Sequence, residues 1–215
     1  MNENLIETQN IEKRSKIKDF YEKNKIRIIL FLVSIIILVI SLTFYLETKK
    51  DKRLALSENY IDAKIHLAKG EKDKAKDILQ KIILKNDSTY STLSLFLILN
   101  ENLIVDKNEL SNLFNYILEN CKFEKEIEKL IIFKKALLET SYVNEEILFK
   151  SLKPLLTGES LWKPHALLLI GDYYLSKKEN IKAKEFYTEI LKLKNLPKEF
   201  YNRSKVQLTL LKNEQ

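Results

Sequence analysis

An uncharged apolar run near the N-terminus constrains this chain more than any other feature. Residues 28–46 form 19 consecutive positions without a charge, a glycine or a proline. At 1.5 Å of rise per helical residue the run spans about 28 Å, close to the roughly 30 Å hydrocarbon core of a bilayer. A buried core helix is seldom apolar on every face over such a length, and the apolar region of a signal peptide is usually shorter. The run therefore predicts an uncleaved membrane-spanning helix over residues 26–46.

Basic residues on the two sides of this run predict its orientation. Residues 11–27 hold seven lysines and arginines, whereas residues 47–62 hold four. Because the flank richer in basic residues stays in the cytoplasm, we expect a short cytoplasmic tail over residues 1–25 and the remaining chain, residues 47–215, across the membrane. The tail is too short and polar to form a core, so we expect it to be partly disordered, with an amphipathic helical stretch close to the membrane.

The part of the chain after the span has the pattern of an all-α protein. The whole sequence holds three glycines and three prolines, fewer than strand-rich folds need for their tight turns. Asp106 and Glu109 have the spacing of a capping box, Asn144 begins a second apolar periodic stretch, and Gly158 follows it as a C-terminal cap. We therefore expect helices of roughly 11–18 residues joined by connections of about 3–6 residues, which is typical of an array of antiparallel helical hairpins.

The last helix, over residues 197–212, is expected to cover the open apolar end of that array, as terminal elements of repeat proteins do. Its expected apolar side comprises Phe200, Val206, Leu208 and Leu211, and its polar side comprises Lys198, Glu199, Arg203, Lys205 and Lys212.

Pairs of small residues recur at a fixed spacing in residues 47–215. Ala63 lies 12 residues before Ala75, and Gly171 lies 12 residues before Ala183. A weaker copy places Ala136 and Leu148 at the same separation. This spacing resembles the tetratricopeptide repeat, a helix–turn–helix unit of 34 residues whose two helices pack closely at small side chains. The expected fold is therefore all-α, with a single N-terminal transmembrane helix followed by a degenerate tetratricopeptide-like helical-hairpin array.

The whole arrangement resembles a family of ancillary Sec-translocon subunits of proteobacteria. The similarity is best over residues 123–211, where residues 167–175 and 183–187 look like the last repeat of that family. The resemblance implies a single-pass protein of the bacterial inner membrane with a periplasmic domain. It implies the Sec translocon and a membrane-anchored periplasmic chaperone as partners, in the maturation of exported proteins. A periplasmic coordinator of cell division or cell-wall assembly has the same architecture and is the alternative.

The sequence offers few groups for catalysis or for holding a cofactor. Three isolated glycines exclude the glycine-rich phosphate-binding motifs, and two histidines with one cysteine exclude a multi-histidine zinc site. We expect no enzyme activity, no metal, no cofactor and no small-molecule substrate. The net charge of +7 is the balance of 37 basic and 30 acidic residues, and 33 of the basic residues are lysines and only 4 are arginines. This lysine bias does not indicate nucleic-acid binding. His66 is expected to be a packing residue, Cys121 a half-buried thiol, and Trp162 an anchor between repeat units.

A partner-binding surface is expected on the first helix of each pair, because these helices line the concave face of tetratricopeptide-like arrays. The candidate residues are spaced by three and four along those helices: Tyr60, Lys64 and Leu67; Leu130, Phe133 and Leu137; and His165, Leu168, Asp172 and Leu175. The set is mostly apolar, which suits an amphipathic helix or an extended apolar segment. The alternative is that neighbouring helices cover these side chains as ordinary core.

Overall fold

A computed structural model describes residues 3–158 and 160–213, and for residues 3–20 and 28 it describes the backbone alone. Within these ranges the chain forms nine α-helices and no β-strand. The helices are α1 (Glu3–Ala68), α2 (Lys72–Ile83), α3 (Tyr90–Asn100), α4 (Lys107–Asn120), α5 (Lys125–Glu139), α6 (Glu145–Leu156), α7 (Lys163–Ser176), α8 (Asn180–Leu191) and α9 (Lys198–Asn213). The connections from α1 to α9 are three to six residues long, as the sequence predicts.

Helix α1 contains the apolar run. An 18-residue stretch of it has a mean hydropathy of 2.9 and none of that stretch is buried, so the helix is long and apolar enough to cross a membrane. The backbone is already helical from Glu3, whereas the sequence led us to expect partial disorder over residues 1–25; residues 1 and 2 lie outside the described residues. No proline or glycine interrupts the chain before Gly70, which is why the helix continues so far.

The chain divides into two compact units, Met1–Ala55 and Leu56–Gln215. The second unit begins later than residue 47, the expected start of the repeat domain. Residues 47–55 belong to α1, and all of them except the half-buried Thr48 are exposed. The first side chain of α1 that packs against a core is Leu56. The exposed stretch is rich in charged residues and has no apolar stripe to bury, so it extends the helix without joining a core.

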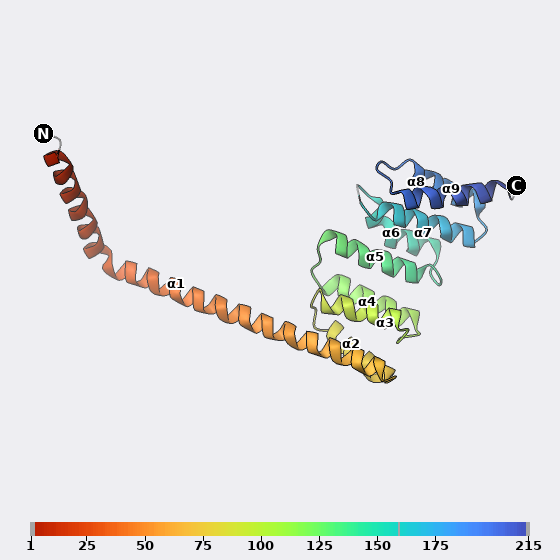
Figure 1. The fold of residues 1–215 in the computed structure, drawn as a ribbon, viewed down its shortest axis with the longest axis horizontal. Helices are drawn as coiled ribbons and strands as arrows, with labels where there is room; N and C mark the ends of the chain where they lie inside the picture. The colour runs from red at the N-terminus through yellow and green to blue at the C-terminus, as the bar shows by residue number, and fades with distance from the viewer. Residues whose placement is uncertain (1–2, 159, 214–215) are drawn as a thin grey trace. The chain divides into compact units, whose positions relative to one another are not determined.

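Two hydrophobic clusters fill the unit Leu56–Gln215. One is built from the end of α1 and from α2, α3 and α4, together with Ile131 of α5. The other is built from α5 to α9 and includes Ala136 of the same helix. Consecutive helices from α2 to α9 contact each other, and α7 also contacts α5 and α9; Figure 1 shows the helices following one another in order, from yellow-orange to blue. Helix α5 therefore joins the two clusters.

Helix ends follow the sequence signals with one correction. The Asp106 carboxylate accepts a hydrogen bond from the Asn108 N–H at 2.8 Å, and the Asn144 side chain accepts one from the Ile147 N–H at 3.0 Å. Each residue therefore caps the N-terminus of its helix. Glu109 does not complete a capping box, because its carboxylate accepts a hydrogen bond from Gln80 Nε2 of α2 at 2.9 Å. A long-range partner thus takes the place of the local backbone partner.

The small-residue positions are all buried: Ala63, Ala75, Ala136, Leu148, Gly171 and Ala183. Helix α9 buries Phe200, Ser204 and Leu211 and contacts α7 and α8. One of its expected apolar residues is misplaced, since Val206 is 56% exposed. Residues 200, 204, 208 and 211 share one helix face, and residue 206 lies about 120° around the helix from the nearest of them.

Candidate binding groove

A groove of about 490 Å³ lies between α5, α7 and α9. Helices α7 and α5 contact each other, and α9 packs against α7, so all three helices supply walls. The lining residues are Phe133 and Leu137 from α5, His165, Leu168, Leu169 and Asp172 from α7, and Glu199, Phe200 and Arg203 from α9. The groove is therefore apolar along α5 and carries its charged groups on α7 and α9.

Five of the ten candidate surface residues line this groove: Phe133, Leu137, His165, Leu168 and Asp172. The other five lie elsewhere. On α1, Tyr60 packs against the N-terminal cluster with its ring 6.2 Å from that of Tyr90, Leu67 is half-buried and Lys64 is exposed. Leu130 is half-buried on α5, and Leu175 packs against the C-terminal cluster. The structure thus brings together two of the three candidates of α5 and three of the four candidates of α7, and it leaves out those of α1.

The contribution of α9 to the groove was not predicted from the sequence. Glu199, Phe200 and Arg203 line the groove from α9, although the sequence predicts residues 197–212 only as a terminal cap. The signal was present, because residues 199, 200 and 203 are spaced by one, three and four and so share one side of a helix. Leu169 of α7 was missed as well.

His165 lies at the centre of an aromatic cluster that forms part of the groove. The centroid of its ring is 4.6 Å from that of Phe200, 4.8 Å from that of Trp162 and 5.5 Å from that of Phe133. Trp162, the residue before α7, also contacts Phe133 at 5.6 Å. Burial among these rings lowers the pKa of His165, because it disfavours the charged imidazolium form. The groove therefore contains a histidine that resists protonation.

Asp172 links three helices at the polar side of the groove. Its carboxylate accepts a hydrogen bond from the Tyr187 hydroxyl of α8 at 2.7 Å and another from Arg203 Nη2 of α9 at 2.7 Å. Burial raises the pKa of Tyr187, and the hydrogen bond to Asp172 raises it further. Because α7, α8 and α9 meet at this carboxylate, the position of the α9 wall is fixed by hydrogen bonds as well as by apolar packing.

A second polar node lies inside the domain, away from the groove. Glu139, at the end of α5, is 3% exposed. Its carboxylate accepts hydrogen bonds from Ser111 of α4 and Ser151 of α6, each at 2.9 Å, and forms an ion pair with Lys135 at 2.9 Å. A buried charge needs such partners. The node therefore ties α4, α5 and α6 together.

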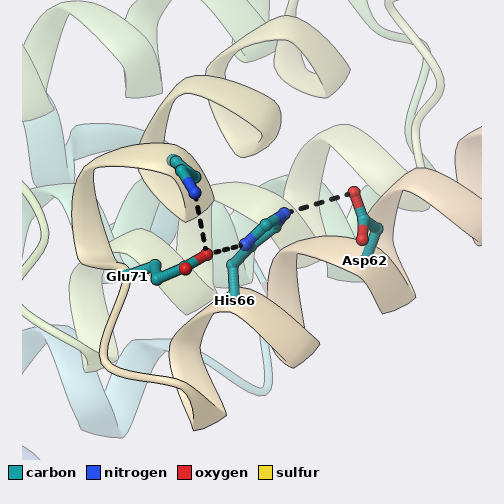
Figure 2. Close-up of polar contacts among 4 residues, drawn as sticks. Asp62, His66 and Glu71 are labelled. Carbon is teal, nitrogen blue, oxygen red and sulfur yellow. Dashed lines mark hydrogen bonds and ion pairs between the residues drawn. The ribbon is translucent and has the colours of Figure 1, made fainter.

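A third cluster lies where α1 ends and α2 begins (Figure 2). His66 Nδ1 is 2.5 Å from Glu71 Oε2, and His66 Nε2 is 3.7 Å from Asp62 Oδ2. The hydrogen bond from His66 lowers the pKa of Glu71, and a second one from Lys74 adds to this effect. The sequence predicts that His66 is only a packing residue. Its ring is indeed half-buried, but both ring nitrogens face carboxylates because Asp62 lies one turn before it and Glu71 begins the next helix.

Cys121 is a buried free thiol at the end of α4. Burial raises the pKa of this thiol, which disfavours the reactive thiolate. Among the residues that the structure describes, no group of three or more histidine, cysteine, aspartate or glutamate side chains could hold a metal ion.

Comparison of the chain with models of protein families, with curated proteins and with solved structures gives no match.

Proposed function

We propose that this chain is a membrane-anchored binding protein. Helix α1 anchors it, and the unit Leu56–Gln215 is a degenerate tetratricopeptide-like array that binds a segment of another protein. The chain performs no reaction in this proposal. The observation that carries it is the groove between α5, α7 and α9, which has a volume of about 490 Å³, apolar side chains along α5, and charged groups on α7 and α9.

The packing of small residues supports the tetratricopeptide-like part of the proposal. Gly171 and Ala183 are both buried, and the Tyr187 ring of α8 occupies the space that a side chain at residue 171 would need. The contacts of α7 with α5 and α9 are the contacts expected between first helices of successive units in a helical-hairpin array.

We propose an amphipathic helix of the partner as the occupant of the groove. A helix can place residues spaced by three and four against Leu137 and the half-buried Phe133, while its polar face stays in water. Leu137 is 46% exposed, so it offers apolar surface that a partner can cover without any rearrangement of the core. An extended apolar segment is the competing occupant, and it would contact the same side chains through alternate residues.

The cellular role is also a proposal. The basic flanks of the span favour an N-terminus in the cytoplasm and a binding domain on the other side of the membrane. By resemblance, the membrane would be the inner membrane of a bacterium and the binding domain would be periplasmic. By resemblance, the partners would be the Sec translocon and a membrane-anchored periplasmic chaperone. A reporter that is active only in the periplasm, fused after Gln215, should then be active; activity of a cytoplasm-specific reporter at the same position would refute this orientation.

Affinity capture tests the binding role directly. The full chain is purified in mild detergent, and the proteins that co-purify are identified by mass spectrometry. Their amount is compared with the amount captured by Leu137→Arg, in which a bulky charge enters the groove. The matched control is Ile181→Arg, because Ile181 is 73% exposed on α8 and lies outside the groove. We expect a defined partner to be lost from Leu137→Arg and retained by Ile181→Arg. Translocon subunits would support the proposed role, whereas wall synthases would support the division alternative; equal capture by both variants would contradict the groove.

A further inference from the structure

The charges that line the groove are not balanced. Asp172 and Glu199 supply two carboxylates, and Arg203 supplies one guanidinium. Arg203 is bound to Asp172 at 2.7 Å, so this pair is neutral overall. His165 adds no charge near neutral pH, because burial lowers its pKa. The remaining group is Glu199, which is exposed on α9. Its carboxylate interacts electrostatically with the His165 ring, and Arg203, the cation of the groove lining, is paired with Asp172 instead.

Aromatic rings line the same groove as this carboxylate. They belong to Phe133, His165 and Phe200; the His165 ring contacts both phenylalanine rings and interacts electrostatically with Glu199. The face of an aromatic ring attracts a cation through its quadrupole. A groove that holds both aromatic rings and a carboxylate therefore suits an ammonium or guanidinium group on a segment that also carries apolar side chains.

We propose that the segment bound in this groove carries a lysine or arginine side chain, which lies between the aromatic rings and Glu199. This inference rests on the proposed function and adds the charge of the partner to it. The aliphatic part of the basic side chain packs against the half-buried ring of Phe133, and its charged end pairs with Glu199. An acidic segment is disfavoured for two reasons. Arg203 already binds Asp172, and the Glu199 carboxylate, one helical turn before Arg203 on α9, would repel a second carboxylate.

The test uses the full chain in nanodiscs of phosphatidylcholine. The probes are three fluorescein-labelled helical peptides with the same leucines at i, i+3, i+4 and i+7 and with lysine, glutamine or glutamate at one position beside them. Further sets of three peptides place the lysine, glutamine or glutamate at other positions along the peptide helix. Fluorescence anisotropy gives each affinity, and empty nanodiscs give the lipid background. We expect the lysine peptide to bind about tenfold more tightly than the glutamate peptide, as a close charge pair in a partly desolvated site allows.

Variants at two exposed glutamates test whether Glu199 is the source of the preference for the lysine peptide. Glu199→Gln should reduce the lysine-to-glutamate preference to within about twofold, and Glu199→Lys should reverse it. Glu185→Gln is the matched control, because Glu185 is exposed on α8 outside the groove, and it should leave the preference unchanged. Equal binding of all three peptides, or a preference that survives in Glu199→Gln, would overturn the inference while leaving the groove as a binding site. Failure of every peptide to bind would overturn both the inference and the proposed function.

Discussion

Gly171 and Tyr187 pack so closely that a methyl group at residue 171 would lie 2.7 Å from Cε1 of the tyrosine ring. The Tyr187 side chain is fully buried, and its hydroxyl donates to Asp172 at 2.7 Å. The ring therefore cannot move aside freely. Only glycine allows α7 and α8 to approach each other as they do, and the same contact holds the carboxylate that fixes the α9 wall of the groove.

Replacement of Gly171 by alanine should destabilise the domain. In an ordinary helix interior this change stabilises by about 1 kcal/mol. Here the added methyl group must displace a buried ring, and overpacking of this kind costs about 1–3 kcal/mol. Urea unfolding of the full chain, followed by circular dichroism, measures the difference.

The double variant Gly171→Ala with Tyr187→Leu provides the control for that prediction. Removal of the ring makes room for the methyl group, so the cost of Gly171→Ala should be smaller in the Tyr187→Leu background. A single Gly171→Ala variant at least as stable as the unchanged chain would show that the close contact does not constrain residue 171.

Glu139 should be essential for the association of α4, α5 and α6. Glu139→Ala leaves Lys135 charged, and the hydroxyls of Ser111 and Ser151 lose their partner. Removal of one member of a buried ion pair costs about 3–5 kcal/mol. Glu139→Gln retains hydrogen bonding and should cost less. Glu146→Ala, at an exposed glutamate of α6, is the control and should change the unfolding free energy by less than about 0.5 kcal/mol. Equal stability of the Ala and Gln variants would contradict a role for the hydrogen bonds.

The sequence predicted where the helices lie better than which side chains of different helices contact each other. Apolar periodicity and capping residues such as Asn144 are local signals, and they placed the helices and the short connections correctly. Glu109 shows the limit of local signals, since its carboxylate binds Gln80, which is 29 residues away. Glu139 shows the same limit. Its burial depends on serines from two other helices, and no local pattern marks a glutamate that neighbouring helices will enclose.

His165 should make the stability of the domain depend on pH near neutrality. Its pKa is lower in the folded chain than its usual value of about 6.5, so the unfolded chain binds the proton more tightly. Stability should therefore be complete above about pH 6.5 and should fall as the pH drops below it, until the folded-state pKa of His165 is passed.

Unfolding midpoints at pH 7.5 and 5.5 measure this dependence. His165→Phe keeps an aromatic ring in the cluster but removes the titrating group, so it should reduce the loss of stability between the two pH values. His66, the second histidine, is unchanged in this comparison. An identical loss in the unchanged chain and in His165→Phe would show that His165 does not carry the effect.

Deletion of residues 197–215 should both destabilise the domain and destroy the groove. Helix α9 buries Phe200 and Leu211, and burial of each such side chain contributes about 1.5–3 kcal/mol. For a domain of this size the melting temperature should fall by about 10 °C. Differential scanning fluorimetry of the truncated and full chains in the same detergent measures the change. An unchanged melting temperature would show that α9 is not a stabilising cap.

The residues that line the groove were predicted in part, because periodicity identifies which residues share a helix face. It correctly placed Phe133 and Leu137 of α5 on the same side as Asp172 and His165 of α7. Periodicity does not identify which helix covers that face. The α9 wall, with Phe200 and Arg203, depends on how the last helix packs on α7 and α8, and the candidates on α1 were excluded because they belong to a different cluster.

The most direct test of the central claim is photo-crosslinking from inside the groove in living cells. A photoreactive phenylalanine derivative replaces Leu137 in the full chain, and in a second strain it replaces the exposed Ile181 of α8. We predict that residue 137 forms a discrete adduct with one partner protein, and that this adduct is lost when Glu199→Lys is added. Residue 181 should not form it. Absence of an adduct from residue 137, or the same adduct from both positions, would contradict the groove between α5, α7 and α9 as the binding site.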